Sequence, residues 1–400
     1  MNVMKNVVFI DGVRTPFGKM GGGLRQFYPA ELGGKAIRGL LDRTGIMERG
    51  GVDCVFFGAA LHDGKCNNIA RYAALCAGMP HDVTASFIET QCGSAIDCVN
   101  HAAWKIATGN ADVVIVGGCE SHSQRFAKFS MSVEPYKQIP PMPIQNALSP
   151  VKEEATDMIY NSDLMAKQWG ITREDCDKFA LRSQKLACEA IESGWLDDQI
   201  IPVTIPATRK TPEIVISKDE HPRKDSTLEG LAKLRPVYEG GVTTAGNSSG
   251  KNDGASCILM MSEDKAKELG YTPVARWIGS AEGGSDPRVM GIAAAYSNIK
   301  LMKKFGLGLN DIDVYECNEA FAAQNLSVIR EMEKQLGGTI DMDRWNPHGG
   351  AIAYGHPNGA SGTRIGIFTM RQLTRTGGKY GLFSSCCGGG IGVSTLIERI

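Results

Sequence analysis

The stretch Thr90-Gln91-Cys92-Gly93-Ser94-Ala95 lies where strand-like sequence gives way to helix-like sequence. The helical spacing of apolar residues continues to Thr108, and the apolar run Val113-Val114-Ile115-Val116 follows, which is typical of a buried strand. Small residues at such a junction let another molecule approach the backbone and leave amide N–H groups free to point at it. The same amides favour a thiolate over a thiol, so Cys92 is a candidate nucleophile.

A second segment repeats this order of elements. Ser361-Gly362 opens a helix-like stretch that ends near Gly378, and the strand-like run Gly381-Leu382-Phe383 follows. The interval from Gly362 to Gly378 is 16 residues, equal to that from Gly93 to Gly109. A repeated helix–strand unit indicates an internal duplication. Two similar halves packed face to face would bring the N-termini of the equivalent helices toward a shared axis.

Strand and helix signals alternate in the first and last thirds of the chain, which predicts a largely parallel sheet covered on both faces. The predicted strands are 7–10, 52–58, 112–116, 311–315 and 380–384, and the predicted helices are 30–41, 68–77, 94–108, 319–334 and 361–374. Between them, about 121–247, proline clusters interrupt any regular sheet. This part contains one strongly amphipathic helix, 173–193, with Thr172 as a suitable cap, and we interpret it as an inserted lobe that covers a site.

The composition is that of an ordinary globular protein. The chain has 400 residues, of which 42% are hydrophobic and 22% charged, and its formal net charge is −1. The length predicts two or three domains. The balanced charge favours neither a nucleic-acid nor a membrane-surface partner. There is no apolar run of the kind that spans a bilayer and no signal-peptide pattern at the start, so we expect a cytoplasmic location.

Twelve cysteines are present, but no Cys-x-x-Cys pair occurs, and we predict no metal site. Most of these thiols are expected to be small buried hydrophobes. Cys386, in Ser384-Ser385-Cys386-Cys387-Gly388-Gly389-Gly390, has small neighbours like those of Cys92. The cluster Gly355-His356-Pro357-Asn358-Gly359-Ala360-Ser361-Gly362 offers a base. A nucleophile, a base and a second acid in glycine-rich settings are what acyl transfer through a thioester needs.

The chain resembles the thiolase superfamily from end to end. The matching segments are the opening Val7 to Phe17, Gln91-Cys92-Gly93-Ser94, Asn318-Glu319-Ala320-Phe321-Ala322, Gly349 to Gly362, and Cys386-x-Gly388-Gly389-Gly390. The resemblance implies a thiolase-like α/β fold: two similar halves, each a mixed five-stranded sheet covered by helices, related by pseudo-twofold symmetry, plus an inserted loop domain. The implied boundaries are 1–120 and 250–273 for the N-terminal half, 121–249 for the inserted CoA-binding lobe, and 274–400 for the C-terminal half.

The resemblance also implies roles for single residues. Cys92 would hold the acyl group as a thioester, and His356 would activate Cys92 and help bind the thioester oxygen. Cys386 would be the general acid/base at the carbon alpha to the carbonyl of a second acetyl-CoA. Asn318, through a water, would form one oxyanion site, and the backbone N–H groups of Cys92 and Gly388 would form another.

Further positions are implied to bind the CoA thioester. Ser249, in Thr244-Ala245-Gly246-Asn247-Ser248-Ser249-Gly250, matches the family residue that contacts pantetheine, and Arg223 lies where the family uses a basic residue against the adenine and phosphates. The other candidate contacts are Met158, Leu234, Ala245, Met290 and Phe321. The expected partners are acyl-CoA and free CoA, without a cofactor or metal, and the family's dimer of dimers predicts a homotetramer.

Three segments that support the acyl pocket depart from the family pattern. They are Gly117-Gly118-Cys119-Glu120-Ser121-His122, where the family often ends in Met, Asp157 to Asp163, and Met290 to Ala294. The reaction class therefore follows from the resemblance, while the acyl-chain preference does not. We predict an acetyl-CoA C-acetyltransferase (acetoacetyl-CoA thiolase) of fatty acid metabolism, working by reversible Claisen condensation and thiolysis. The alternative is a degradative 3-ketoacyl-CoA thiolase for longer or modified acyl chains.

Three other classes fit the sequence less well. Decarboxylating ketoacyl synthases lack the acid/base cysteine of the late Cys-x-Gly-Gly-Gly motif, which is Cys386 here. A catalytically silent CoA-binding subunit would have no need of Cys92, His356 and Cys386 together. A nicotinamide-dependent dehydrogenase is disfavoured because no Gly-x-Gly-x-x-Gly follows the first strand.

Overall fold

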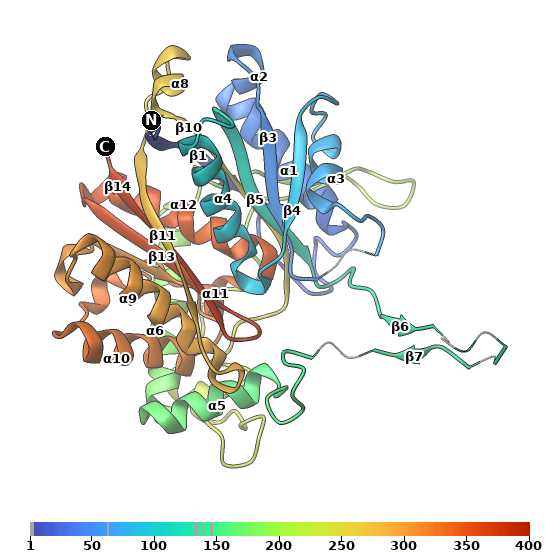
Figure 1. The fold of residues 1–400 in the computed structure, drawn as a ribbon. Helices are drawn as coiled ribbons and strands as arrows, with labels where there is room; N and C mark the ends of the chain where they lie inside the picture. The colour runs from blue at the N-terminus through green and yellow to red at the C-terminus, as the bar shows by residue number, and fades with distance from the viewer. Residues whose placement is uncertain (1–3, 62–63, 132–133, 135, 138, 145–146) are drawn as a thin grey trace.

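The computed structural model describes residues 4–61, 64–131, 134, 136–137, 139–144 and 147–400 (Figure 1). Its centre is a ten-stranded mixed sheet with the strand order β12-β13-β14-β11-β1-β10-β5-β3-β4, and β2 pairs with β10. The strands are β1 (Val7–Arg14), β2 (Gly18–Lys19), β3 (Cys54–Gly58), β4 (Thr84–Ile88), β5 (Val113–Ser121), β10 (Asn252–Ser262), β11 (Ala275–Gly284), β12 (Val314–Cys317), β13 (Tyr380–Cys387) and β14 (Ile391–Arg399).

The strand order shows the internal duplication. The first half of the sheet reads β4-β3-β5-β10-β1, and the second reads β12-β13-β14-β11, which is the same order without its first strand. In each half the last strand in sequence, β10 or β14, runs antiparallel to both of its neighbours. This topology agrees with the two similar α/β halves that were predicted. The prediction of a largely parallel sheet was wrong, because β10 and β14 each return antiparallel between their neighbours and β1 pairs antiparallel with β11.

The C-terminal half departs from five strands. On the outer side of β12, where a counterpart of β4 would lie, Trp345 forms only an isolated bridge with Tyr315. Gly337, Gly338 and Asn346 have positive φ angles of 74°, 96° and 43°. Such left-handed residues interrupt an extended run, so a full fifth strand does not form there.

The two halves join along a short seam. Strands β1 and β11 are paired at two positions, Val8 with Arg276 and Phe9 with Ala275. Helices α4 (Ser94–Ala107) and α12 (Asn358–Thr376) pack against each other next to this seam, and α12 contacts strands of both halves. The approach is close, because a Cβ placed on Gly362 would lie 2.7 Å from the backbone nitrogen of Ile96.

The sheet is covered on both faces. Helices α1 (Pro29–Thr44) and α3 (Ile69–Cys76) pack on one face of the N-terminal half, and α9 (Ala293–Phe305) and α10 (Ala322–Leu336) cover the C-terminal half. Between α4, α12 and the sheet lies a core drawn from both halves; it includes Val99, Ile106, Ile365, Ile367, Phe383 and Ile397. The shorter helices are α2 (Ile46–Arg49), α8 (Glu263–Glu268), α11 (Ala351–Tyr354), and the 3-10 turns 91–93, 287–292, 309–311 and 342–344. Among the described residues, none of the helices is both long and apolar enough to cross a membrane.

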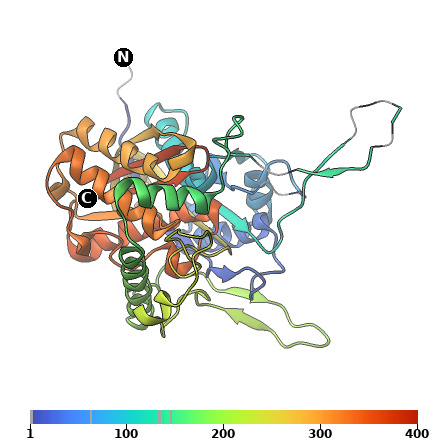
Figure 2. The same ribbon diagram turned by 90° about the horizontal axis from the view of Figure 1, so that it is seen from below.

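Residues 122–251, between β5 and β10, form a lobe. It contains α5 (Met158–Trp169), α6 (Arg173–Glu192), α7 (Leu228–Ala232) and the short hairpins β6–β7 (Phe129–Ser130, Met142–Pro143) and β8–β9 (Val203–Ile205, Ile214–Ile216). The β6–β7 hairpin extends away from the body as an arm (Figures 1 and 2). Helix α6 begins as predicted, since the Thr172 hydroxyl accepts from the Asp175 N–H at 3.1 Å. The exact domain boundaries 1–120, 121–249, 250–273 and 274–400 stay predictions.

Two helix starts differ from those predicted. Helix α12 begins at Asn358 and not at Ser361, because Gly359 to Gly362 form its first turn and not a loop. The small residues serve close packing: a Cβ on Gly359 would lie 2.5 Å from the Cα of Ala59. Helix α10 begins at Ala322 and not at Glu319, because buried hydrogen bonds hold residues 318–321 outside it.

Candidate active site

Cys92 lies in a 3-10 turn directly before α4. Its side chain is buried, and the Asn358 side-chain amide donates to its sulfur, with Nδ2 and Sγ 3.2 Å apart. Burial raises the pKa of the Cys92 thiol to about 11, while the hydrogen bond from Asn358 acts in the opposite direction. The free site therefore holds a protonated thiol at neutral pH, and attack on a thioester needs a base.

His356 is the predicted base, and Asn358, two residues later in its loop, contacts the Cys92 sulfur. Nδ1 of His356 lies 2.6 Å from the Ser361 hydroxyl, which also lies 3.2 Å from the Pro357 carbonyl oxygen. With the hydroxyl proton on that carbonyl, the imidazole proton lies on Nδ1 and Nε2 is the acceptor nitrogen of the ring. Burial, with smaller effects from His122 and Arg364, lowers the pKa of His356 to about 3, so the ring is neutral.

Asn318 follows β12 and faces His356. Its Nδ2 lies 3.4 Å from His356 Nε2, and its backbone N–H donates to the Ser384 carbonyl at 2.9 Å. The Asn318 Oδ1 is buried and has no hydrogen-bond partner among the described residues. A buried amide oxygen aimed at a site without a protein donor is suited to hold a water or a substrate N–H or O–H.

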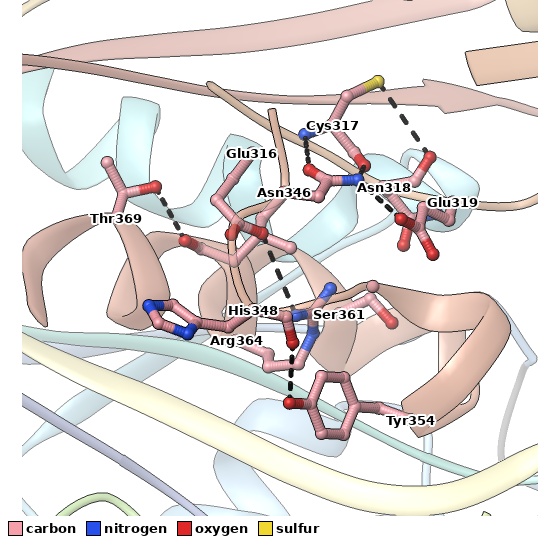
Figure 3. Close-up of polar contacts among 12 residues, drawn as sticks. Glu316, Cys317, Asn318, Glu319, Asn346, His348, Tyr354, Ser361, Arg364 and Thr369 are labelled. Carbon is pink, nitrogen blue, oxygen red and sulfur yellow. Dashed lines mark hydrogen bonds and ion pairs between the residues drawn. The ribbon is translucent and has the colours of Figure 1, made fainter. Parts of the chain in front are cut away.

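Hydrogen bonds from Asn346 and Glu319 hold the loop that carries Asn318 in place (Figure 3). The Asn346 side chain accepts from the Cys317 N–H at 2.9 Å and donates to the Cys317 carbonyl at 3.0 Å and to Glu319 at 2.9 Å. Glu319 also accepts from the Ser183 hydroxyl of α6 at 2.6 Å, which fastens the lobe to this loop. Fixed donors and acceptors of this kind hold Asn318 in place before substrate arrives.

A buried ion pair lies in the same region. Glu316 on β12 and Arg364 on α12 are 3.9 Å apart and almost fully buried (Figure 3). Burial raises the pKa of Glu316 to about 8, against the attraction of Arg364. The pair links the strand that precedes Asn318 to the helix that carries Ser361, the partner of His356.

Cys386 lies near the end of β13, beside the Cys92 loop. Burial raises the pKa of the Cys386 thiol well above its usual value, and the next largest cause is the neighbouring Cys92. The following turn approaches the same loop: a Cβ on Gly388 would lie 3.3 Å from Gln91 Cγ and 3.5 Å from Met158 Cε. Among the described residues, the Gly388 N–H donates to no backbone carbonyl. The fold thus brings both sulfurs and the His356 loop together.

The predicted CoA-contact segment runs beside the Asn318 loop. The Ser249 N–H donates to the Ala320 carbonyl at 3.0 Å, and Ser248 forms a bridge with Phe321. The next residue, Gly250, accepts the backbone N–H of His356 at 3.2 Å. Ser249 and Phe321 therefore lie, in the folded chain, close to the loop that carries the predicted base His356.

The other predicted contacts lie farther from the sulfurs. Leu234 is 37% exposed and packs beside Gly246, next to the exposed Ala245. Arg223 is exposed, and its backbone N–H donates to Gln184 at 2.8 Å. Met290 is buried, and its N–H donates to Asn161 of α5 at 3.2 Å.

No group of three or more His, Cys, Asp or Glu residues that could hold a metal ion occurs in the described part of the chain.

Comparison with known proteins assigns the family. The thiolase N-terminal domain matches residues 7–264, and the thiolase C-terminal domain matches residues 271–399. The chain belongs to the thiolase family. The acetyl-CoA acetyltransferase of Syntrophomonas wolfei is 40% identical to this thiolase over 99% of the chain and 100% of its own length. A β-ketoadipyl-CoA thiolase of Acinetobacter baylyi is also 40% identical, with the same coverage of both chains.

A solved structure agrees with this assignment. The crystal structure of the Bacillus anthracis acetyl-CoA acetyltransferase matches with a TM-score of 0.91 at 39% identity, covering 100% of each chain. The predicted family, the thiolase fold and the class of enzyme, an acyltransferase, are confirmed.

The sequence reasoning missed two side chains of this site. Asn358 and Ser361 were seen as parts of a small-residue motif and received no role. Both lie in the first turn of α12, two and five residues after His356. A polar residue directly after the His-Pro pair was the available signal for Asn358.

Proposed function

We propose that this thiolase is an acetyl-CoA C-acetyltransferase that joins two acetyl-CoA molecules into acetoacetyl-CoA and runs the reverse thiolysis. The proposal rests on one observation above the others. A buried thiol, Cys92, neighbours a second buried thiol, Cys386, and its sulfur contacts Asn358, which lies two residues after the neutral imidazole His356. A nucleophile, an acid/base and a proton acceptor are the groups that a two-step acyl transfer requires.

In the first step Cys92 attacks the carbonyl carbon of acetyl-CoA. The new bond joins Sγ to that carbon, the thiol proton passes to His356 Nε2, and the same proton leaves with the CoA sulfur when the carbon–sulfur bond of CoA breaks. The oxyanion that forms in between accepts from the N–H groups of Cys92 and Gly388. Removing one such donor typically costs about 2.7–4 kcal/mol of barrier, so their placement matters.

In the second step Cys386 acts on another acetyl-CoA. The Cys386 proton first passes to His356 Nε2. The thiolate then removes the proton alpha to the carbonyl, and the enolate oxygen is held by the Nε2–H of His356 and by a water on Asn318. The carbanion attacks the acetyl group, the bond to Cys92 breaks, Cys386 gives the alpha proton to the Cys92 thiolate, and His356 returns the first proton to Cys386. A weakly acidic carbon needs a strong base, and burial gives the Cys386 thiolate that strength.

A thiolase for longer or carboxylated 3-oxoacyl chains is the second candidate. It is favoured by the Acinetobacter relative, which is as similar as the acetyl-CoA acetyltransferase. Rates of thiolysis with acetoacetyl-CoA, 3-oxohexanoyl-CoA and 3-oxoadipyl-CoA distinguish the two. We expect the highest kcat/KM with acetoacetyl-CoA, and a maximum with 3-oxoadipyl-CoA would replace the first proposal by the second.

The acyl-enzyme is tested on Cys92 itself. After mixing with acetyl-CoA, mass spectrometry of the peptides is expected to show an acetyl group on the Cys92 peptide. Cys92→Ser should show none and lose at least about 10³-fold in activity, because the nucleophile is removed. An acetylated wild-type peptide other than that of Cys92, or an active Cys92→Ser enzyme, would contradict the mechanism.

The proposal includes a homo-oligomer, for which a dimer of dimers is the family precedent, and CoA thioesters as the partners in fatty acid metabolism. The arm around β6–β7 supports assembly, since it projects from the body and exposes apolar side chains (Figure 2). The exposed apolar residues include Phe126, Phe129, Met131, Tyr136 and Met142. Sedimentation velocity of the intact protein measures the assembly, and a monomer at working concentration would count against it.

A further inference from the structure

Asn358 connects the Cys92 sulfur to a second histidine that has no role in the scheme above. Its Nδ2 lies 3.2 Å from Cys92 Sγ, and its Oδ1 lies 2.7 Å from Nε2 of His122. His122 comes directly after β5 in the N-terminal half, whereas Asn358 begins α12 in the C-terminal half. The pair therefore spans the two halves at the nucleophile.

The amide has two possible orientations, and His122 selects between them. With Oδ1 toward His122, the amide presents an N–H to the sulfur; with the amide reversed, it would present a lone pair. Burial lowers the pKa of His122, the hydrogen bond to Asn358 acts in the opposite direction, and Lys251 and Arg125 have smaller lowering effects. With its pKa below the usual value, the ring is neutral at neutral pH. A neutral ring with its proton on Nε2 donates to Oδ1 and keeps the N–H of Asn358 on the sulfur.

The charges around Cys92 make this donor necessary. Burial is the main cause that disfavours a thiolate at Cys92, and Glu120 and Glu89 add smaller effects in the same direction. The neighbouring Cys386 and Cys387 would add to the repulsion if ionised. Glu120 itself holds the start of α12, because it accepts the Gly359 N–H at 3.1 Å and the Ala60 N–H at 2.8 Å. Burial raises the pKa of Glu120 to about 8, which limits its negative charge beside the nucleophile at neutral pH.

The bond to Asn358 changes during the reaction. A thiolate accepts a hydrogen bond strongly, whereas a thioester sulfur accepts one weakly. The donor thus stabilises Cys92 when it attacks and again when it leaves in the second step, and it contributes little to the acylated resting form. Only interactions that strengthen toward the transition state accelerate the chemistry.

We propose that Asn358 is a catalytic residue that donates a hydrogen bond to the Cys92 thiolate, and that His122 is a positioning residue that fixes the orientation of the Asn358 amide. The proposal rests on the assignment of Cys92 as the nucleophile. His356 accepts the proton of Cys92, and Asn358 stabilises the charge that remains on the sulfur.

The test follows the ionisation of Cys92 by its alkylation. Iodoacetamide is added across a neutral-to-alkaline pH series, and the rate at the Cys92 peptide is read by mass spectrometry. In Asn358→Leu we expect the midpoint to rise by about one pH unit, that is, about tenfold less thiolate at a given pH, because one hydrogen bond to a charged group is lost. Asn358→Asp keeps the size of the side chain but places a negative charge beside the Cys92 sulfur, so the pH midpoint of alkylation should rise further.

The histidine variants test the orientation. His122→Leu should raise the midpoint in the same direction by a smaller amount, because the Asn358 amide can then turn over. His122→Gln retains an N–H that can reach Oδ1 and should restore the midpoint toward that of the wild type. In both Asn358 variants kcat should fall with little change in KM. The matched control is Asn110→Leu, an exposed amide beyond the C-terminal end of α4.

The outcomes separate the two proposals. An unshifted midpoint in both Asn358→Leu and Asn358→Asp, in a wild-type enzyme that acetylates Cys92, would overturn the role of Asn358 and leave the proposed function intact. No acetylation of wild-type Cys92 would instead overturn the proposed function. Equal midpoints in His122→Leu and His122→Gln would remove the positioning role. Circular dichroism of each variant identifies misfolded protein, and the two Asn358 and two His122 substitutions give each residue a second test.

Discussion

The same hairpin occurs in both halves of the molecule, but its strands are joined very differently. In the N-terminal half, β5 and β10 pair from Ser121 and Asp253 onward, and residues 122–251 lie between the strands. In the C-terminal half, β13 and β14 pair up to Cys387 and Ile391, and only residues 388–390 lie between them. One connection is a whole lobe, and the other is a turn of three glycines.

The difference indicates that the two connections of the duplicated fold have different roles. The glycine turn lets Gly388 pack close to Gln91 and Met158. Cys386, two residues earlier, is a neighbour of Cys92. The lobe crosses to the other half, where Ser183 bonds Glu319 next to Asn318. We infer that the short connection serves the chemistry and the long one serves binding and support. Each of the predictions below tests one side of that division.

The largest effect on activity is expected at Cys386, next to the glycine turn 388–390. Cys386→Ala should still accept an acetyl group on Cys92, because the nucleophile and His356 are unchanged. Condensation and thiolysis should fall by about 10²–10⁴-fold, since the general acid/base is lost. Single-turnover acetylation and steady-state thiolysis measure the two steps separately. Normal condensation by this variant would mean that the turn does not supply the acid/base.

The lobe's support is tested at its bond to the C-terminal half. Ser183→Ala removes the hydroxyl that donates to the buried Glu319 at 2.6 Å. Leaving that carboxyl with one donor fewer should cost about 1–3 kcal/mol in the free energy of unfolding. Denaturant titration gives the value, and Ser193→Ala, where the hydroxyl meets its own helix at 3.3 Å, is the matched control. An equal loss in both variants would show that this bond does not anchor the lobe.

A pH effect is expected from His221, at the end of the lobe beside Gly250. Burial lowers the pKa of His221 from 6.5 to about 4, with a smaller effect from Arg223. Below pH 6.5 the unfolded chain binds a proton there that the folded chain does not, so stability falls as the pH falls from 6.5 toward 4.

The expected size is about 1.4 kcal/mol per pH unit for this one group. His221→Gln should lose less stability than the wild type between neutral pH and about pH 5.5, because glutamine does not titrate. Denaturant titrations at the two pH values give the difference. Parallel loss in both proteins would mean that His221 is protonated inside the fold.

The smallest effect is expected at the outer edge of the lobe. Arg223→Ala removes an exposed charge proposed to meet the phosphates of CoA. We expect KM for CoA thioesters to rise about 2–5-fold with kcat nearly unchanged, in line with the modest value of exposed ion pairs. The same change should have little effect on a pantetheine thioester that lacks the nucleotide. Equal effects on both substrates would place Arg223 outside the nucleotide site.

The sequence predicted six of the α-helices and five of the strands that the structure describes, but it missed other apolar elements such as β10, β14 and α9. Helix α6 and its Thr172 cap, and the strands around Val113 and Tyr380, lie where the pattern indicated. The start of α12 was misplaced by three residues, because Gly359 and Gly362 favour a loop locally. Only the close packing of Gly359 against Ala59 and of Gly362 against α4 explains them as helix. Local pattern cannot report a contact that another part of the chain creates.

The candidate site divides in the same way. Cys92, His356 and Cys386 were found because each lies in a recognisable motif. The part played by Asn358 depends on a sulfur 266 positions away in sequence and on His122 at the end of a different strand. Neither neighbour is visible from the motif around Asn358, so only the folded chain reveals the connection.

The close crossing of α4 and α12 has a consequence for how this enzyme can fail. Cys92 precedes one helix and His356 precedes the other, and the seam between β1 and β11 is too short to set their spacing alone. The alignment of the reactive groups therefore also depends on the contacts of α12 with the N-terminal half, among them that of Gly362 with Ile96. A methyl group at that crossing would act as a wedge. We expect such a variant to keep both halves folded, with Cys92 and His356 each in its own half, and to lose activity because the two groups are no longer aligned.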